Sequence, residues 1–304
     1  MSTTHRVIVD TDIGDDIDDA FCLAFLLKAT EHFSSVFIKT CYGDPNRRLR
    51  PARAMMRAAY DAGLAGDHRN VGVSSGVDDS LEMPKGYGKI GTRYLYGDTL
   101  PADFYYPSTF GLYPGDQIDA ALSIGPLTNL ALSIREDQTA MAKLRHVVMA
   151  GEFVKPGFIE HNVRCDVPAA AKAFASGIAI EVIPWSIGPM TKLVDSDIVR
   201  IMKAGSTGDA ICRLLVDWLM EFWGTVPGKT NMYDPMTAVA LLHPEWFEWK
   251  TGRVSVDTSR SDTRGLTTIV ADSEGPHRIA TRVDVANAKG LLLDTLCCKV
   301  GGSA

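Results

Sequence analysis

The chain has no apolar run of the length that a membrane span needs. No stretch approaches the roughly 18 apolar residues of a transmembrane helix, and the polar start at residues 1–6 leads into a strand-like run without a signal-peptide pattern. Cysteine is also scarce, and the six cysteines form neither a disulfide framework nor a CxxC zinc motif. These absences predict a cytoplasmic protein with no membrane partner.

Positive charge is in short supply as well. The 304 residues include 31 Lys and Arg against 37 Asp and Glu, which gives a net charge of −6. A polyphosphate partner favours a basic surface, so the charge argues against nucleic acid. Gly and Pro occur at ordinary levels, and internal repeats and low-complexity linkers are absent from the sequence. A chain of this length can bury a large core, so we expect a single domain over residues 1–304.

Short apolar strands alternate with helical patterns, which predicts a parallel sheet covered by helices. A buried strand at 7–9 is followed by apolar residues at helical spacing, Ala20, Leu23, Ala24 and Leu27. Further strands are predicted at 36–38, 71–73, 120–124, 147–150 and 180–183. Helices with proline in the first turn are predicted at 126–134 and 168–174.

The last third of the chain changes character. From about residue 195 the pattern predicts helices at 211–223 and 235–242, short strands at 254–256, 268–270 and 279–281, and a final helix within 285–296. Segments rich in Gly, Tyr and Pro predict surface loops at 83–97, 103–115 and 225–233. The fold class expected is α/β: an open, mostly parallel, Rossmann-like sheet with helices on both faces and extra C-terminal helices and short strands.

An unusual density of carboxylates follows the first strand. Six aspartates fall within ten residues, at Asp10, Asp12, Asp15, Asp16, Asp18 and Asp19. In open α/β sheets, ligands bind at the carboxyl ends of the strands, and Asp18 also suits the N-terminus of the next helix. A helix cap and solvated acids would explain one or two of these residues. Six would repel one another unless a divalent cation neutralises them, so the cluster predicts a cation site.

The same segment resembles the inosine–uridine-preferring nucleoside hydrolase family, whose hallmark is DxDPGxDDA after the first strand. This chain reads DTDIG from Asp10 and DDA from Asp18, with two extra residues between the halves, which resembles a subgroup written DTDxGxDxDDA. Further family motifs are matched in order by IKTCYGD at 38–44, IGPLTN at 124–129, MAG at 149–151 with EHN at 160–162 and DVP at 166–168, and YDP at 233–235. Each motif is weak alone, but their shared order makes chance a poor explanation.

The resemblance implies hydrolysis of the N-glycosidic bond of ribonucleosides to free base and ribose, in purine or pyrimidine catabolism and salvage. It implies a Ca²⁺ ion held by Asp12, Asp19, Asp234 and the main-chain carbonyl of Ile124, a set of hard oxygen ligands. A water and two ribose hydroxyls would complete the shell. Asp12 would then be the general base that activates the Ca²⁺-bound water. Relatives are dimers or tetramers, so a homodimer or homotetramer is expected.

The resemblance also implies a substrate-binding set. Its members are Asp18, Asp44, Met149, Glu160, Asn162 and Tyr233. Asp44 stands where the family usually has asparagine, and Tyr233 replaces a histidine often credited as the leaving-group acid. Tyr233 is therefore also a catalytic candidate, either as a ring that stacks on the base or as a proton donor. His161 replaces phenylalanine and could point outward or contact the base.

Two other functions compete with this interpretation. A haloacid-dehalogenase-like phosphatase also opens with a strand followed by DxD, but its pattern has threonine or valine where this chain has Gly14. A catalytically weak member of the same fold could instead bind a ribosyl ligand. Asp44, Tyr233 and the short segment at 154–159 favour that alternative. The sequence does not distinguish among purine, pyrimidine and modified bases.

Overall fold

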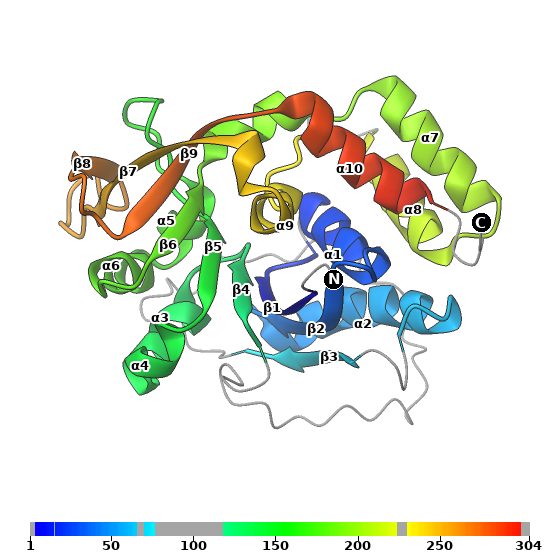
Figure 1. The fold of residues 1–304 in the computed structure, drawn as a ribbon, viewed down its shortest axis with the longest axis horizontal. Helices are drawn as coiled ribbons and strands as arrows, with labels where there is room; N and C mark the ends of the chain where they lie inside the picture. The colour runs from blue at the N-terminus through cyan, green and yellow to red at the C-terminus, as the bar shows by residue number, and fades with distance from the viewer. Residues whose placement is uncertain (1–3, 15, 66–69, 77–117, 224–229, 299–304) are drawn as a thin grey trace.

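The computed structural model describes residues 4–14, 16–65, 70–76, 118–223 and 230–298. Within these residues, nine strands form one sheet in the order β3-β2-β1-β4-β5-β6-β9-β7-β8 (Figure 1). They are β1 (His5–Thr11), β2 (Phe33–Thr40), β3 (Asn70–Ser75), β4 (Ala120–Ser123), β5 (Arg145–Met149), β6 (Ile180–Ile183), β7 (Phe247–Val256), β8 (Thr267–Ala271) and β9 (His277–Val283). Neighbours from β3 to β9 pair in parallel, and β7 pairs antiparallel with both β9 and β8. The mostly parallel α/β fold predicted from the sequence is confirmed.

The helices follow the strands much as their patterns predicted. They are α1 (Asp18–Lys28), α2 (Pro45–Asp61), α3 (Thr128–Glu136), α4 (Gln138–Met141), α5 (His161–Cys165), α6 (Val167–Ala175), α7 (Asp195–Ser206), α8 (Ala210–Trp223), α9 (Pro235–Leu242) and α10 (Val285–Cys297), with 3₁₀ turns η2 (Trp185–Thr191) and η3 (Pro244–Trp246). Proline stands in the first turn of α6, as predicted. The same prediction for α3 is wrong, because that helix begins only at Thr128 and Pro126 belongs to the turn before it.

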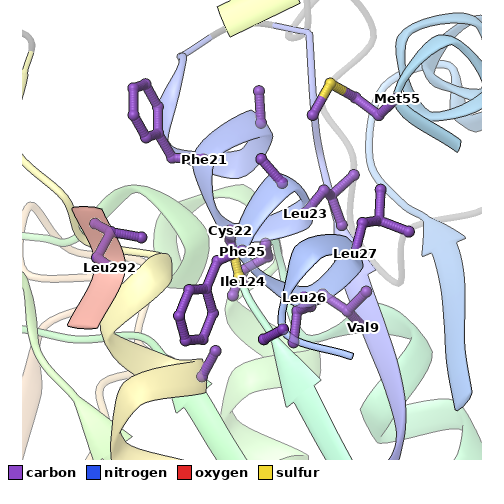
Figure 2. Packing of buried hydrophobic residues seen from close by; sticks show 14 of the residues in the cluster. Val9, Phe21, Cys22, Leu23, Phe25, Leu26, Leu27, Met55, Ile124 and Leu292 are labelled. Carbon is purple, nitrogen blue, oxygen red and sulfur yellow. The ribbon is translucent and has the colours of Figure 1, made fainter. Parts of the chain in front are cut away.

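Two hydrophobic cores lie on opposite faces of the sheet, since successive strand residues point to opposite faces. Val7 and Val9 of β1 belong to the core that contains α1, α2, α8, α9 and α10, whereas Ile8 belongs to the core beneath α3 and α6. Every residue of α1 is buried, because this helix lies between the sheet and the surrounding helices (Figure 2). Its first turn holds Asp18 and Asp19, and the residues between them and Lys28 at the other end are apolar.

Some predictions fall partly or wholly outside the described part of the chain. The loops expected at 83–97 and 103–115 lie outside it, as does Asp15, and only 230–233 of the third loop lies within it. Among the described residues, no helix has both the length and the apolar character needed to cross a membrane.

Candidate active site

Four buried aspartates converge at the carboxyl edge of the sheet. Asp12 directly follows β1, Asp18 and Asp19 open α1, and Asp234 precedes α9. One side-chain oxygen each from Asp18, Asp19 and Asp234 can be chosen so that all three lie within 4.8 Å of one another. Asp234 occupies the N-cap position of α9 without a side-chain capping hydrogen bond. Its carboxylate therefore joins the cluster instead of closing the helix end.

The loop after β1 is shaped to present these carboxylates. The Thr11 hydroxyl donates to Oδ1 of Asp19 at 2.5 Å and accepts from the Ile13 amide at 3.1 Å. Gly14, at φ 127°, adopts a backbone conformation that side-chain-bearing residues rarely take. Thr11 thus couples the turn to the orientation of Asp19, which explains why a hydroxyl residue stands between the two aspartates of DTD.

The glycine of IGPLTN is required by a close approach. A Cβ on Gly125 would lie 2.9 Å from Oδ1 of Asp12 and 2.6 Å from the Cys41 sulfur. Both distances are shorter than van der Waals contact, so a larger residue would displace Asp12. The asparagine of the same motif, Asn129, donates to Oδ1 of the fully buried Asp10 at 3.1 Å. Asp10 therefore links the end of β1 to α3, and it is not among the described pocket-lining residues.

Glu160 and Asn162 bring the β4 and β5 strand ends together. The side-chain nitrogen of Asn162 donates to the carbonyl oxygens of Ile124 at 2.9 Å and Met149 at 3.0 Å. Glu160 accepts from the amides of Asn162 at 2.7 Å, Val163 at 3.0 Å and Gly151 at 3.1 Å. Because both hydrogens of the Asn162 amide are used, its side-chain oxygen is the group that it can offer to a ligand hydroxyl.

The electrostatics of the cluster favour a cation. Burial, reinforced by the charges of Asp16 and Asp12, raises the pKa of Asp18 to about 8. Burial and the neighbouring aspartates also raise the pKa of Asp19 and Asp234 well above the usual range. Like charges this close in a buried site favour protonation unless a positive charge compensates them. A set of hard carboxylate and carbonyl oxygens fits a divalent cation such as Ca²⁺ or Mg²⁺.

A pocket of about 120 Å³ opens above the carboxylates. Its described lining residues are Asp12, Asp16, Asp18, Asp19, Ile124, Met149, Glu160, His161, Asn162, Trp185, Tyr233 and Asp234. The structure thus brings together every predicted site residue except Asp44. The side chain of Asp44 instead accepts from the Arg47 amide at 3.0 Å and caps α2, with 46% of the side chain exposed. The helix N-terminus provides this partner, so Asp44 is held away from the pocket.

Aromatic rings form another part of the pocket wall. Trp185 and Tyr233 stack with centroids 6.0 Å apart and planes at 27°. The Tyr233 ring lies directly on Gly188, where a Cβ would come within 1.9 Å of it, and the Tyr233 hydroxyl accepts from the Asn231 side chain at 2.9 Å. Sequence reasoning missed Trp185. Its position just past β6, after Pro184, lies at the ligand-binding edge of the sheet and was the signal that could have found it.

His161 lines the pocket and is also exposed to solvent. Its ring meets that of Tyr42 edge-on at 6.1 Å, and Nε2 lies 3.4 Å from the Cys165 sulfur. Burial raises the pKa of the Cys165 thiol to about 12, so this thiol stays protonated and can donate to the imidazole. His161 is thereby held at the pocket mouth.

The parallel sheet with buried carboxylates at its carboxyl edge places this protein among the α/β proteins that bind a ligand at the strand ends. Comparisons with known proteins identify the family. The family model described as inosine-uridine preferring nucleoside hydrolase matches residues 7–290. A probable uridine nucleosidase 2 from Oryza sativa subsp. japonica is 31% identical over 280 residues, which cover 84% of this chain and 79% of that protein.

Solved structures share the fold. A plant nucleoside hydrolase, PpNRh1, superimposes with a TM-score of 0.74 at 23% identity, covering 97% of this chain and 100% of the other. An inosine-guanosine nucleoside hydrolase gives a TM-score of 0.76 at 17% identity, covering 99% and 100%. The chain belongs to the inosine-uridine preferring nucleoside hydrolase family. The family, the fold class and the enzyme class expected from the motifs are thereby confirmed, and the family is generally metal-dependent.

Proposed function

We propose that this chain hydrolyses the N-glycosidic bond of ribonucleosides with a Ca²⁺ ion held by Asp12, Asp19, Asp234 and the carbonyl of Ile124. The observation that carries the proposal is the convergence of buried carboxylates in a pocket that stacked aromatic rings also line. Carboxylates suit a cation and the sugar hydroxyls, whereas rings suit a flat base. The pocket therefore offers groups suited to both the sugar and the base of a nucleoside.

The bound cation would orient the ribose diol and lower the pKa of the attacking water. Asp12 would act as the general base for the attacking water. Asp18 accepts a hydrogen bond from a ribose hydroxyl, and Asn162 and Glu160 face the 3′ and 5′ side of the sugar. The N-glycosidic bond breaks through an oxocarbenium-like state, as glycosidic bonds generally do, and the carboxylates stabilise its positive charge.

Tyr233 and Trp185 hold the base. Burial raises the pKa of Tyr233, so its phenol stays protonated at neutral pH and is a weak acid. This favours stacking over proton donation as the main contribution of Tyr233. The curated rice relative is named for uridine and the second solved structure for inosine and guanosine. The aromatic wall accepts either kind of ring, so both purine and pyrimidine nucleosides belong in the test.

A release assay tests the proposal. The protein is incubated with a panel of purine, pyrimidine and modified ribonucleosides, with p-nitrophenyl riboside and with p-nitrophenyl phosphate, and reducing sugar, nitrophenol and phosphate are measured. Sugar release from nucleosides supports the proposal. Phosphate release alone indicates the haloacid-dehalogenase-like chemistry, and riboside binding without turnover indicates a ribosyl-binding protein. We also propose a cytoplasmic homodimer or homotetramer, which light scattering on purified protein tests for the oligomeric state.

A further inference from the structure

A fully buried arginine lies beneath the aspartate loop. Arg48 is the fourth residue of α2 and has no exposed surface. Burying a guanidinium costs free energy unless its donors are satisfied, and a cation in the first turn of a helix meets the positive end of the helix dipole. Its neighbour Arg47 is exposed, as both considerations favour. The buried position of Arg48 therefore needs a compensating set of contacts.

Those contacts join two turns at the carboxyl edge. Nη1 of Arg48 donates to the carbonyl of Asp12 and, at 3.1 Å, to that of Ile13, in the turn after β1. Nε donates to the carbonyl of Tyr42 at 2.7 Å, in the turn after β2. Tyr42 has φ 63°, an uncommon conformation for a residue with a side chain, which persists only where the surroundings enforce it. Arg48 supplies part of that enforcement.

We propose that Arg48 is a positioning residue that fixes the main chain of Asp12 and thereby the carboxylate that meets the cation. The inference deepens the proposed function and rests on it. A guanidinium presents donors in a rigid planar fork, and a lysine ammonium is a single point on a flexible stem. Only the guanidinium can donate to carbonyls in the turns after β1 and β2 at the same time. The positive charge of Arg48 also interacts electrostatically with the Asp19 carboxylate.

Arg48 could position Asp12 or could only compensate the charge of the carboxylates. These two roles predict opposite changes in Ca²⁺ affinity when Arg48 is replaced, so a measurement of that affinity distinguishes them. Removing a positive charge near the carboxylates strengthens their attraction for a cation if their geometry is kept. Loss of the Arg48 hydrogen bonds weakens cation binding, because the main chain of Asp12 is then no longer held in position. Arg48→Lys keeps the charge and loses the fork, whereas Arg48→Met loses both. Arg57→Gln is the matched control, because Arg57 lies on the same helix, 39% exposed, and pairs with Asp61 at 2.8 Å.

The experiment is calorimetric titration of each chelator-treated protein with Ca²⁺, together with thermal unfolding of the metal-free form. We expect Arg48→Lys and Arg48→Met to bind Ca²⁺ at least about tenfold more weakly than wild type and Arg57→Gln to bind it unchanged. With a nucleoside substrate and saturating Ca²⁺, kcat should fall more than KM rises in Arg48→Lys.

The remaining outcomes are also decisive. If Arg48→Met binds Ca²⁺ more tightly than wild type and Arg48→Lys binds it unchanged, Arg48 acts only as a counter-ion to the carboxylates. A lower Tm with wild-type affinity in both would show a purely structural role. Either result overturns the inference, and Arg48→Lys decides alone if Arg48→Met does not fold. Absence of binding by the wild-type protein would instead contradict the proposed function, so the two failures are distinguishable.

Discussion

Replacing Gly125 by alanine tests the link between packing and chemistry in this site. The added methyl group would start 2.6 Å from the Cys41 sulfur and 2.9 Å from Oδ1 of Asp12. Ordinary contacts need about 3.5 Å or more, so the neighbours must move by roughly 0.5–1 Å. Overpacking of this kind costs about 1–3 kcal/mol of stability. A displacement of about 1 Å at a catalytic group can cost about 10²-fold in rate.

We therefore expect Gly125→Ala to lower kcat on a nucleoside by about 10²-fold, to weaken Ca²⁺ binding, and to leave a folded protein. Circular dichroism and thermal unfolding check the fold, and initial rates of sugar release check kcat. Gly290→Ala is the control, since nothing lies within 4 Å of a Cβ at that position in α10. Wild-type kcat and Ca²⁺ affinity in folded Gly125→Ala would refute the placement of Asp12 at the reacting centre.

Three further predictions follow from the site. Asp12→Asn should lower kcat by about 10²–10⁴-fold, the usual cost of losing a general base, while Asp16→Asn at the exposed rim costs much less; equal losses in initial-rate assays would contradict these roles. Tyr233→Phe should keep most of the kcat/KM on inosine and Tyr233→Ala should lose it, because stacking needs only the ring; equal inactivity would show that the phenol is the acid. Metal-free protein should become less stable as pH rises from about 4 to about 8, since Asp18, at about 8 against 3.8 in the unfolded chain, holds a proton in the native state that the unfolded state has released. Saturating Ca²⁺ should remove that fall in Tm, and a Tm that rises over this range without metal would contradict it.

The sequence predicted the framework because hydrophobic periodicity is a local property. Each strand predicted from an apolar run has a counterpart in the sheet, and the cation site followed from the rule that strand ends of a parallel sheet share an edge. The density of aspartates after β1 then pointed to Asp12, Asp18 and Asp19, whereas Asp234 was predicted only from the family resemblance. These inferences needed no knowledge of which helix packs on which.

The parts that were missed depend on contacts between distant segments. Trp185 acquires its place because β6 ends beside the turn that carries Tyr233, residues far apart in the chain. Arg48 is buried because the first turn of α2 packs against the turns that follow β1 and β2. Nothing in the local sequence of α2 indicates that one of its charged residues is buried. Asp44 was expected in the pocket from the family's motif, but the adjacent helix N-terminus captures its side chain. A sequence motif does not show whether a side chain such as that of Asp44 caps the adjacent helix or reaches a ligand in the pocket.

The measurement that tests the central claim most directly is release of reducing sugar from a ribonucleoside by chelator-treated protein before and after Ca²⁺ is added, with Asp19→Asn alongside. Asp19 lies in the cluster without being the proposed base, so its replacement removes a proposed cation ligand and leaves the side chain of Asp12 unchanged. The proposed cation site predicts no turnover without metal, turnover restored in the wild type by Ca²⁺, and little restoration in Asp19→Asn. Turnover that is unaffected by removal of metal and retained in Asp19→Asn would contradict it.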